Sequence, residues 1–98
     1  MSFTSANKDQ ILAILGYPIT ADSMSLIDSK TAKVETASAS AVTRVQGYLT
    51  ELTAIEEELK TARDLPGSAF AQIKQEARRF TSLVSLALSL DIKTDAWS

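Results

Sequence analysis

The chain has 98 residues, of which 45% are apolar and 22% charged, and its 10 basic and 12 acidic side chains give a net charge of −2. This is the composition of one small folded domain, and it excludes an intrinsically disordered chain. Cysteine and histidine are both absent, which excludes disulfides, thiolate or imidazole metal sites and nucleophiles activated by histidine.

The first predicted helix covers residues 6–15. Thr4 or Ser5 can cap its N-terminus, because their hydroxyls accept hydrogen bonds from the first free backbone N–H groups. The isoleucines and leucines of this segment are spaced to form one apolar face. Gly16 favours the left-handed conformation that follows a helix end, and Pro18 prevents the helix from continuing.

The second predicted helix covers residues 21–63, a length of about 60 Å if it is unbroken. From Val45 onward its apolar residues recur at alternating steps of three and four, as in a heptad repeat. A break within residues 29–40 stays open, because the serines and threonines there compete with the helix for backbone hydrogen bonds.

A turn over residues 64–68, which contains Pro66 and Gly67, precedes the third predicted helix, residues 68–90, which Ser68 can cap. The apolar residues of this helix step by three and four and nearly encircle its last turns, which leaves a strand there as the alternative. The short turn predicts that the second and third helices lie antiparallel. The expected fold is a single all-α domain with a short N-terminal helix, a long central helix, an α-helical hairpin and an extended tail over residues 91–98.

Charged residues near the predicted turn are assigned to the solvated surface. Glu56, Glu57 and Glu58 follow one another on a helix and so point in different directions, which argues against a cation site. Lys74, Arg78 and Arg79 are expected to pair with glutamates of the second helix rather than with phosphates. We expect no catalytic residue, no cofactor and no metal, so the chain is not expected to be an enzyme.

Neither a secretory signal nor a membrane span is expected. The N-terminus lacks a basic start followed by a long apolar run, and the most apolar stretch, residues 83–90, is too short to cross a bilayer. Basic residues are scattered along the sequence, so no stripe for phosphate-driven nucleic-acid binding is expected either. These patterns predict a soluble protein made in the cytoplasm.

The predicted helices differ in length, and this predicts an assembly. The third helix covers only the second half of the central helix, so the first half is covered either by the first helix folding back or by another subunit. We expect a homo-oligomer. The candidate residues of its subunit interface are Met24, Leu26, Ile27, Val34, Leu86 and Leu88.

Trp97 carries two alternative interpretations. It lies next to the last residue of the sequence, where little of the domain is expected to surround it. Either it packs into a local apolar patch, or it inserts into a partner as interface tryptophans do.

The layout of the sequence resembles the small helical head-to-tail adaptor (connector) proteins of tailed bacteriophages. The features that carry the resemblance are the short helix closed by Gly16-Tyr17-Pro18, the long helix, the charged hairpin over residues 56–63, Arg78-Arg79 on the third helix, and the run from Leu83 to Ile92 before an aromatic-bearing tail.

The resemblance implies a structural virion protein without enzymatic activity. It implies a homo-oligomeric ring that follows the portal's symmetry, docks on the portal protein and joins the capsid to neck or tail-completion proteins, with DNA only as the passing genome. Leu90, Ile92 and Trp97 are then the candidate portal-binding residues. The alternative is a helical-hairpin or coiled-coil scaffold module unrelated to phages.

Overall fold

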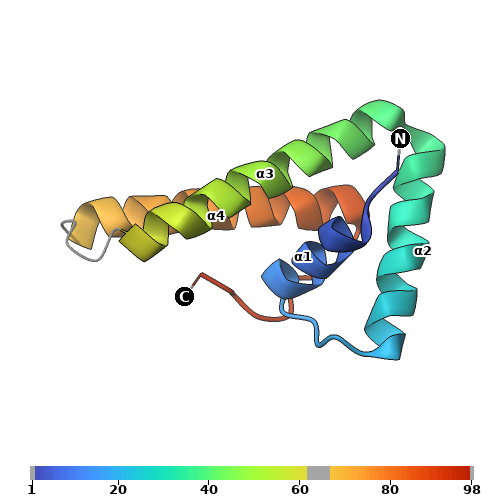
Figure 1. Cartoon of the computed structure of the whole chain (residues 1–98), viewed down its shortest axis with the longest axis horizontal. Coiled ribbons are helices and arrows are strands. Elements are labelled where there is room, and N and C mark those ends of the chain that lie inside the picture. Colours follow the sequence, from blue (N-terminus) through green and yellow to red (C-terminus); the bar gives the residue numbers. More distant parts are fainter. Residues whose placement is uncertain (1, 62–66, 98) are drawn as a thin grey trace.

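The computed structural model describes residues 2–61 and 67–97, apart from the side chain of Ser68. Over these residues the chain forms four helices and no strand (Figure 1): α1 (Ser5–Leu15), α2 (Ala21–Ala37), α3 (Ala39–Thr61) and α4 (Gly67–Leu88). The all-α expectation is confirmed, and the strand alternative is wrong because α4 continues through its apolar last turns. Most of the expected turn over residues 64–68, and the expected cap by the Ser68 side chain, lie outside the described residues.

The first helix begins one residue before the predicted start, with Thr4 as its N-cap, and ends at the predicted Leu15. The Thr4 hydroxyl accepts a hydrogen bond of 3.0 Å from the backbone N–H of Asn7, whose side chain accepts one of 3.0 Å from the N–H of Thr4. This reciprocal pair satisfies two donors at the helix start. At the other end Gly16 has a φ of 82°, which an L side chain rarely adopts.

The long central helix is replaced by two helices that meet at a sharp angle at Ser38 (Figure 1). The break lies inside the range where the sequence left one open. Ser38 has extended backbone angles of −165° and 120°, and its N–H still bonds the Val34 carbonyl at the end of α2. Its hydroxyl accepts a 3.2 Å hydrogen bond from the N–H of Ala41, so one serine ends α2 and caps α3.

Helices α3 and α4 run side by side in opposite directions, and their common end extends beyond α1 and α2 along the 43 Å longest dimension (Figure 1). Their facing residues are the apolar ones of the heptad-like pattern. The ring centroids of Tyr48 and Phe80 lie 5.9 Å apart in a tilted arrangement. The buried side chains on the two helices include Val45, Leu52, Ile55, Ala77 and Val84.

Helix α1 covers the part of the chain that the third predicted helix could not reach. It packs against all three other helices, and its four large apolar side chains, Ile11, Leu12, Ile14 and Leu15, are buried. Of the two ways predicted to cover this region, the structure shows the fold-back of the first helix. The core is therefore shared by all four helices within one chain.

Two of the candidate subunit-interface residues are core residues of the chain itself. Ile27 is fully buried and Leu88 nearly so, so neither can contact a neighbouring subunit in this conformation. The reason is that α1 lies against α2 and the end of α4 closes over the same core.

Candidate interaction surface

Residues 89–97 follow α4 as a segment that folds back on the domain instead of extending from it. The backbone turns at Ser89, which has a φ of 54°. The N–H of Leu90 donates a hydrogen bond of 3.0 Å to the Ser85 carbonyl. The N–H groups of Lys93 and Thr94 then donate to the Leu15 carbonyl at 2.8 and 3.3 Å. The tail thus occupies the free C-terminal end of α1.

Contacts with the α1–α2 connection fix the same segment. The Tyr17 hydroxyl donates a hydrogen bond of 3.0 Å to the Asp91 carbonyl, and the Lys93 ammonium lies 5.1 Å from the centroid of the Tyr17 ring. A Cβ atom added to Gly16 would lie 2.7 Å from Cβ and N of Thr94. The glycine at this helix end therefore serves both the turn and the close approach of the tail.

The end of the tail binds α4 through Arg78, Thr81, Asp95 and Trp97. The Arg78 Nε donates to Asp95 Oδ2 at 2.8 Å, and the backbone N–H of Trp97 donates to Asp95 Oδ1 at 2.9 Å. The Trp97 indole N–H donates to the Thr81 hydroxyl at 2.8 Å. Backbone and side chain of the tryptophan are both held, so the tail has one defined position on the helix.

The Asp95 carboxylate is stabilised in its charged form. The hydrogen bond from the Trp97 backbone N–H and the bond from the Arg78 guanidinium together hold the pKa of Asp95 below its ordinary value of 3.8. Both side chains of the ion pair are nearly half exposed, so water screens the pair and its energetic contribution is small.

The tail contacts decide between the two interpretations of Trp97. Trp97 and Leu90 are buried in the chain's own domain, which is the local-patch interpretation. The expectation that both side chains are available as anchors for a partner does not fit this conformation. Ile92, the third candidate, is 41% exposed at the rim of a pocket of about 240 Å³, whose lining includes Arg78, Ser82 and Trp97.

The basic residues of α4 have partners other than the expected glutamates of the preceding helix. Arg78 pairs with Asp95 in the tail, and Arg79 lies 3.5 Å from Glu76 on its own helix. The Lys74 ammonium lies 4.7 Å from the Phe70 ring centroid. Arg78 differs from the expectation because the tail returns along α4 and brings the Asp95 carboxylate with it, whereas Arg79 and Lys74 have their partners within α4.

The remaining subunit-interface candidates divide by exposure. Leu86 is 77% exposed, and Leu26 lies at the exposed boundary with 36%. Met24 and Val34 are half-buried against the core. Among the four, Leu26 and Leu86 are accessible to a neighbouring molecule, and they lie on α2 and α4 respectively.

A groove between α2 and the end of α4 was not predicted from the sequence. It has a volume of about 310 Å³, and the lysines at its edge, Lys30 and Lys33, form no ion pair with any described residue. The spacing of its α2 residues by three and four positions was the available signal. Its apolar or small lining residues are Val34, Ala37, Ala87, Leu88 and Ser89.

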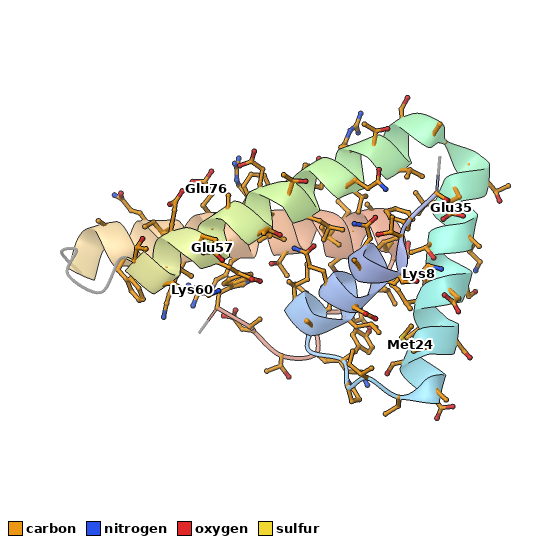
Figure 2. All side chains as sticks on the ribbon, in the orientation of Figure 1. Lys8, Met24, Glu35, Glu57, Lys60 and Glu76 are labelled. Carbon is orange, nitrogen blue, oxygen red and sulfur yellow. The ribbon has the colours of Figure 1, made fainter. Side chains whose placement is uncertain are left out.

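The acidic residues of α2 near this groove bond α1 and the segment before it instead; Figure 2 labels Lys8 and Glu35. Asp28 forms an ion pair of 2.9 Å with Lys8, and the Glu35 carboxylate accepts a hydrogen bond of 2.9 Å from the backbone N–H of Phe3. Positive charge on the groove side of α2 is therefore not neutralised by the carboxylates of the same helix.

Within residues 2–61 and 67–97, no three acidic side chains lie close enough together to hold a metal ion. None of the described helices is long and apolar enough to cross a membrane. Comparisons with protein-family models, with curated proteins and with solved structures gave no match to this chain.

Proposed function

We propose that the chain is a subunit of a head-to-tail adaptor of a tailed bacteriophage, a structural virion protein without enzymatic activity. The proposal rests on the resemblance in layout. It is supported by a small helical body in which α3 and α4 lie side by side, and by a C-terminal segment that is positioned by defined contacts. The strongest support is that Leu26, Leu86 and Ile92 remain exposed although the core of the chain is complete. The groove between α2 and α4 adds two lysines, Lys30 and Lys33, that form no ion pair with a described residue.

Accessible apolar side chains on three different elements favour a protein with several neighbours. In the proposed ring, which follows the symmetry of the portal, adjacent copies contact each other laterally, the portal protein binds on one side, and neck or tail-completion proteins bind on the other. The genome passes through this ring without sequence-specific contacts, in keeping with the scattered basic residues and the net charge of −2.

Within this proposal Ile92 is the portal-side residue. Leu90 and Trp97 hold the tail against the domain, whereas Ile92 is presented outward between them. An exposed apolar residue on a positioned segment has little conformational entropy to lose on binding, which favours its use as an anchor.

The experiment is co-expression of the chain with the portal protein encoded in the same genome, followed by affinity purification of the portal and electron microscopy. We expect a ring of added density on the portal and loss of the complex in an Ile92→Asp variant. Ile19→Asp is the matched control, because Ile19 is 63% exposed but lies on the α1–α2 connection.

Three outcomes contradict the proposal: a genome without a portal gene, a portal that purifies without the chain, or equal loss of binding with the control substitution. A dimer that does not bind the portal, and whose folding stability depends on protein concentration, favours the helical-scaffold alternative.

A further inference from the structure

Helix α2 presents a row of side chains with a defined order of charge, of which Asp22, Leu26 and Lys33 are exposed and Lys30 is half-buried. Along the helix the order is acidic, apolar, basic and basic, and Leu26 supplies the apolar position. The steps of four, four and three keep these residues on one face. We call this row the α2 surface; its members are Asp22, Leu26, Lys30 and Lys33.

Helix α3 presents a second exposed row with the opposite order. It begins with a basic residue, continues with glycine, and ends with two glutamates separated by alanine, at steps of three and four. These residues lie on a different face of α3 from the buried residues that contact α4. We call this row the α3 surface; its members are Arg44, Gly47, Glu51, Ala54 and Glu58.

Gly47 has no packing role within its own chain. Apart from its adjoining residues and the backbone of its own helix, a Cβ atom built at this position would meet no atom of the described residues within 4 Å. A glycine inside a helix lowers helix stability relative to alanine, and its usual use is to let another backbone or a large side chain approach closely. Since no such neighbour lies among the described residues, the position fits a neighbour from another molecule.

The two surfaces match when α2 of one copy lies parallel to α3 of another. With Asp22 beside Arg44, the rise of about 1.5 Å per residue brings Leu26 to Gly47 and Lys30 to Glu51. Lys33 then lies between Glu51 and Glu58, within reach of either carboxylate. Opposite charges meet at each polar position, and the leucine meets the residue that has no side chain.

Space for such a contact exists beside the α2 surface. A shallow hollow of about 470 Å³ lies along α2 there, because the side chains that line it are mostly small: Ser29, Ala32, Lys33, Thr36 and Ala37. Small residues let two helix axes approach closely. The basic groove next to the hollow continues this surface toward α4.

We propose that the α2 surface of one copy binds the α3 surface of the next. The two surfaces lie on helices that diverge from Ser38 (Figure 1), and all their residues except half-buried Lys30 are exposed, so one copy does not pair them internally. The contact uses different patches on its two sides, and a repeated contact of this type closes into a ring or continues as a filament. In that respect the inference builds on the proposed function, although its test needs no portal.

The first test exchanges the charges of the two surfaces. Lys30→Glu with Lys33→Glu should raise the dissociation constant of self-association more than tenfold in sedimentation equilibrium, because like charges then face each other. Glu51→Lys with Glu58→Lys should do the same. All four substitutions in one chain should restore association, since the charges are again opposite.

The control is Glu56→Lys with Glu57→Lys, which changes the net charge as much as the α3 pair does but lies outside the α3 surface. Equal weakening by this control, or a fourfold variant that does not recover, overturns the proposal. So does an unsubstituted chain that stays monomeric up to about 1 mM, a concentration at which even millimolar affinities are detected. Far-ultraviolet circular dichroism verifies that each variant is folded.

The second test is Gly47→Ala. The methyl group has free space within the chain and helix propensity favours alanine, so the melting temperature of the monomer should rise. Self-association should nevertheless weaken severalfold, because the methyl group occupies the place of Leu26 from the neighbour. Unchanged or stronger association overturns the inferred register.

These results are independent of the portal experiment. If both tests succeed but the chain does not bind the portal, the interface is supported and the adaptor function is contradicted. If all charge variants bind the portal equally well, the adaptor function is supported and this interface is contradicted.

Discussion

The indole N–H of Trp97 donates a hydrogen bond of 2.8 Å to the hydroxyl of Thr81, and both side chains are buried. The same hydroxyl donates to the Ala77 carbonyl at 2.8 Å. Each partner is therefore satisfied, which a buried polar pair requires. Through this pair a segment that follows the last helix becomes part of the domain core.

Removing the indole should destabilise the whole domain. Trp97→Ala deletes a large buried side chain and leaves a cavity beside α4, so we expect a loss of about 3 kcal/mol in the free energy of unfolding. Trp97→Phe keeps much of the apolar volume but leaves the Thr81 oxygen without its donor, and should cost about 1–2 kcal/mol. Urea denaturation followed by far-ultraviolet circular dichroism measures both, and a Trp97→Phe variant as stable as the unsubstituted chain would show that the hydrogen bond contributes nothing.

Acid should loosen the tail before it unfolds the helices. The pKa of Asp95 is lowered in the folded chain, so its carboxylate contributes stability above the ordinary value of 3.8 that is lost as the pH falls through the lowered value. The fluorescence of Trp97, the only tryptophan, reports the tail in an acid titration. Asp95→Asn should remove the acid transition of the fluorescence, and a transition that persists in this variant would assign it to another carboxylate.

The local parts of the fold could be predicted from the sequence because neighbouring residues determine them. Thr4 caps α1, Gly16 ends it, and the serine-rich stretch does contain the break between α2 and α3. In each case a side chain or a glycine acts on backbone groups within four residues, so spacing alone carries the information.

The course of the tail could not be predicted from spacing, because its partners are distant in sequence. Lys93 bonds Leu15, and Asp91 accepts from Tyr17, across more than seventy residues. Because the tail lies there, Trp97 is a residue of the domain core and not an exposed anchor for a partner. The candidate surface that remains, on α2 and α3, depends on which residues stay exposed, and that follows only from the packing of α1.

Alanine at two glycines should have opposite effects on stability. At Gly16 the φ of 82° and the 2.7 Å approach to Thr94 make a Cβ costly, and we expect Gly16→Ala to reduce the free energy of unfolding by about 2 kcal/mol. Gly47→Ala, in open space on a helix, should raise it by about 0.5–1 kcal/mol. Thermal and urea unfolding of dilute samples check both signs. An undiminished free energy of unfolding in Gly16→Ala would refute the close approach of the tail at Gly16, and destabilisation by Gly47→Ala would refute the open space at Gly47.

Ile27 and Leu86 should respond to truncation in opposite ways, although the sequence pattern assigns both to a subunit interface. Ile27 is fully buried between α2 and the core, so Ile27→Ala should cost about 3 kcal/mol at any protein concentration. Leu86 is 77% exposed, and Leu86→Ala should change the stability of the monomer by less than about 0.5 kcal/mol. Measuring urea midpoints at two widely separated protein concentrations distinguishes the contributions, because only a residue covered by a neighbouring copy has an effect that grows with concentration. A concentration-independent loss of several kcal/mol at Leu86 would mean that this side chain is covered within its own chain, contrary to the structure.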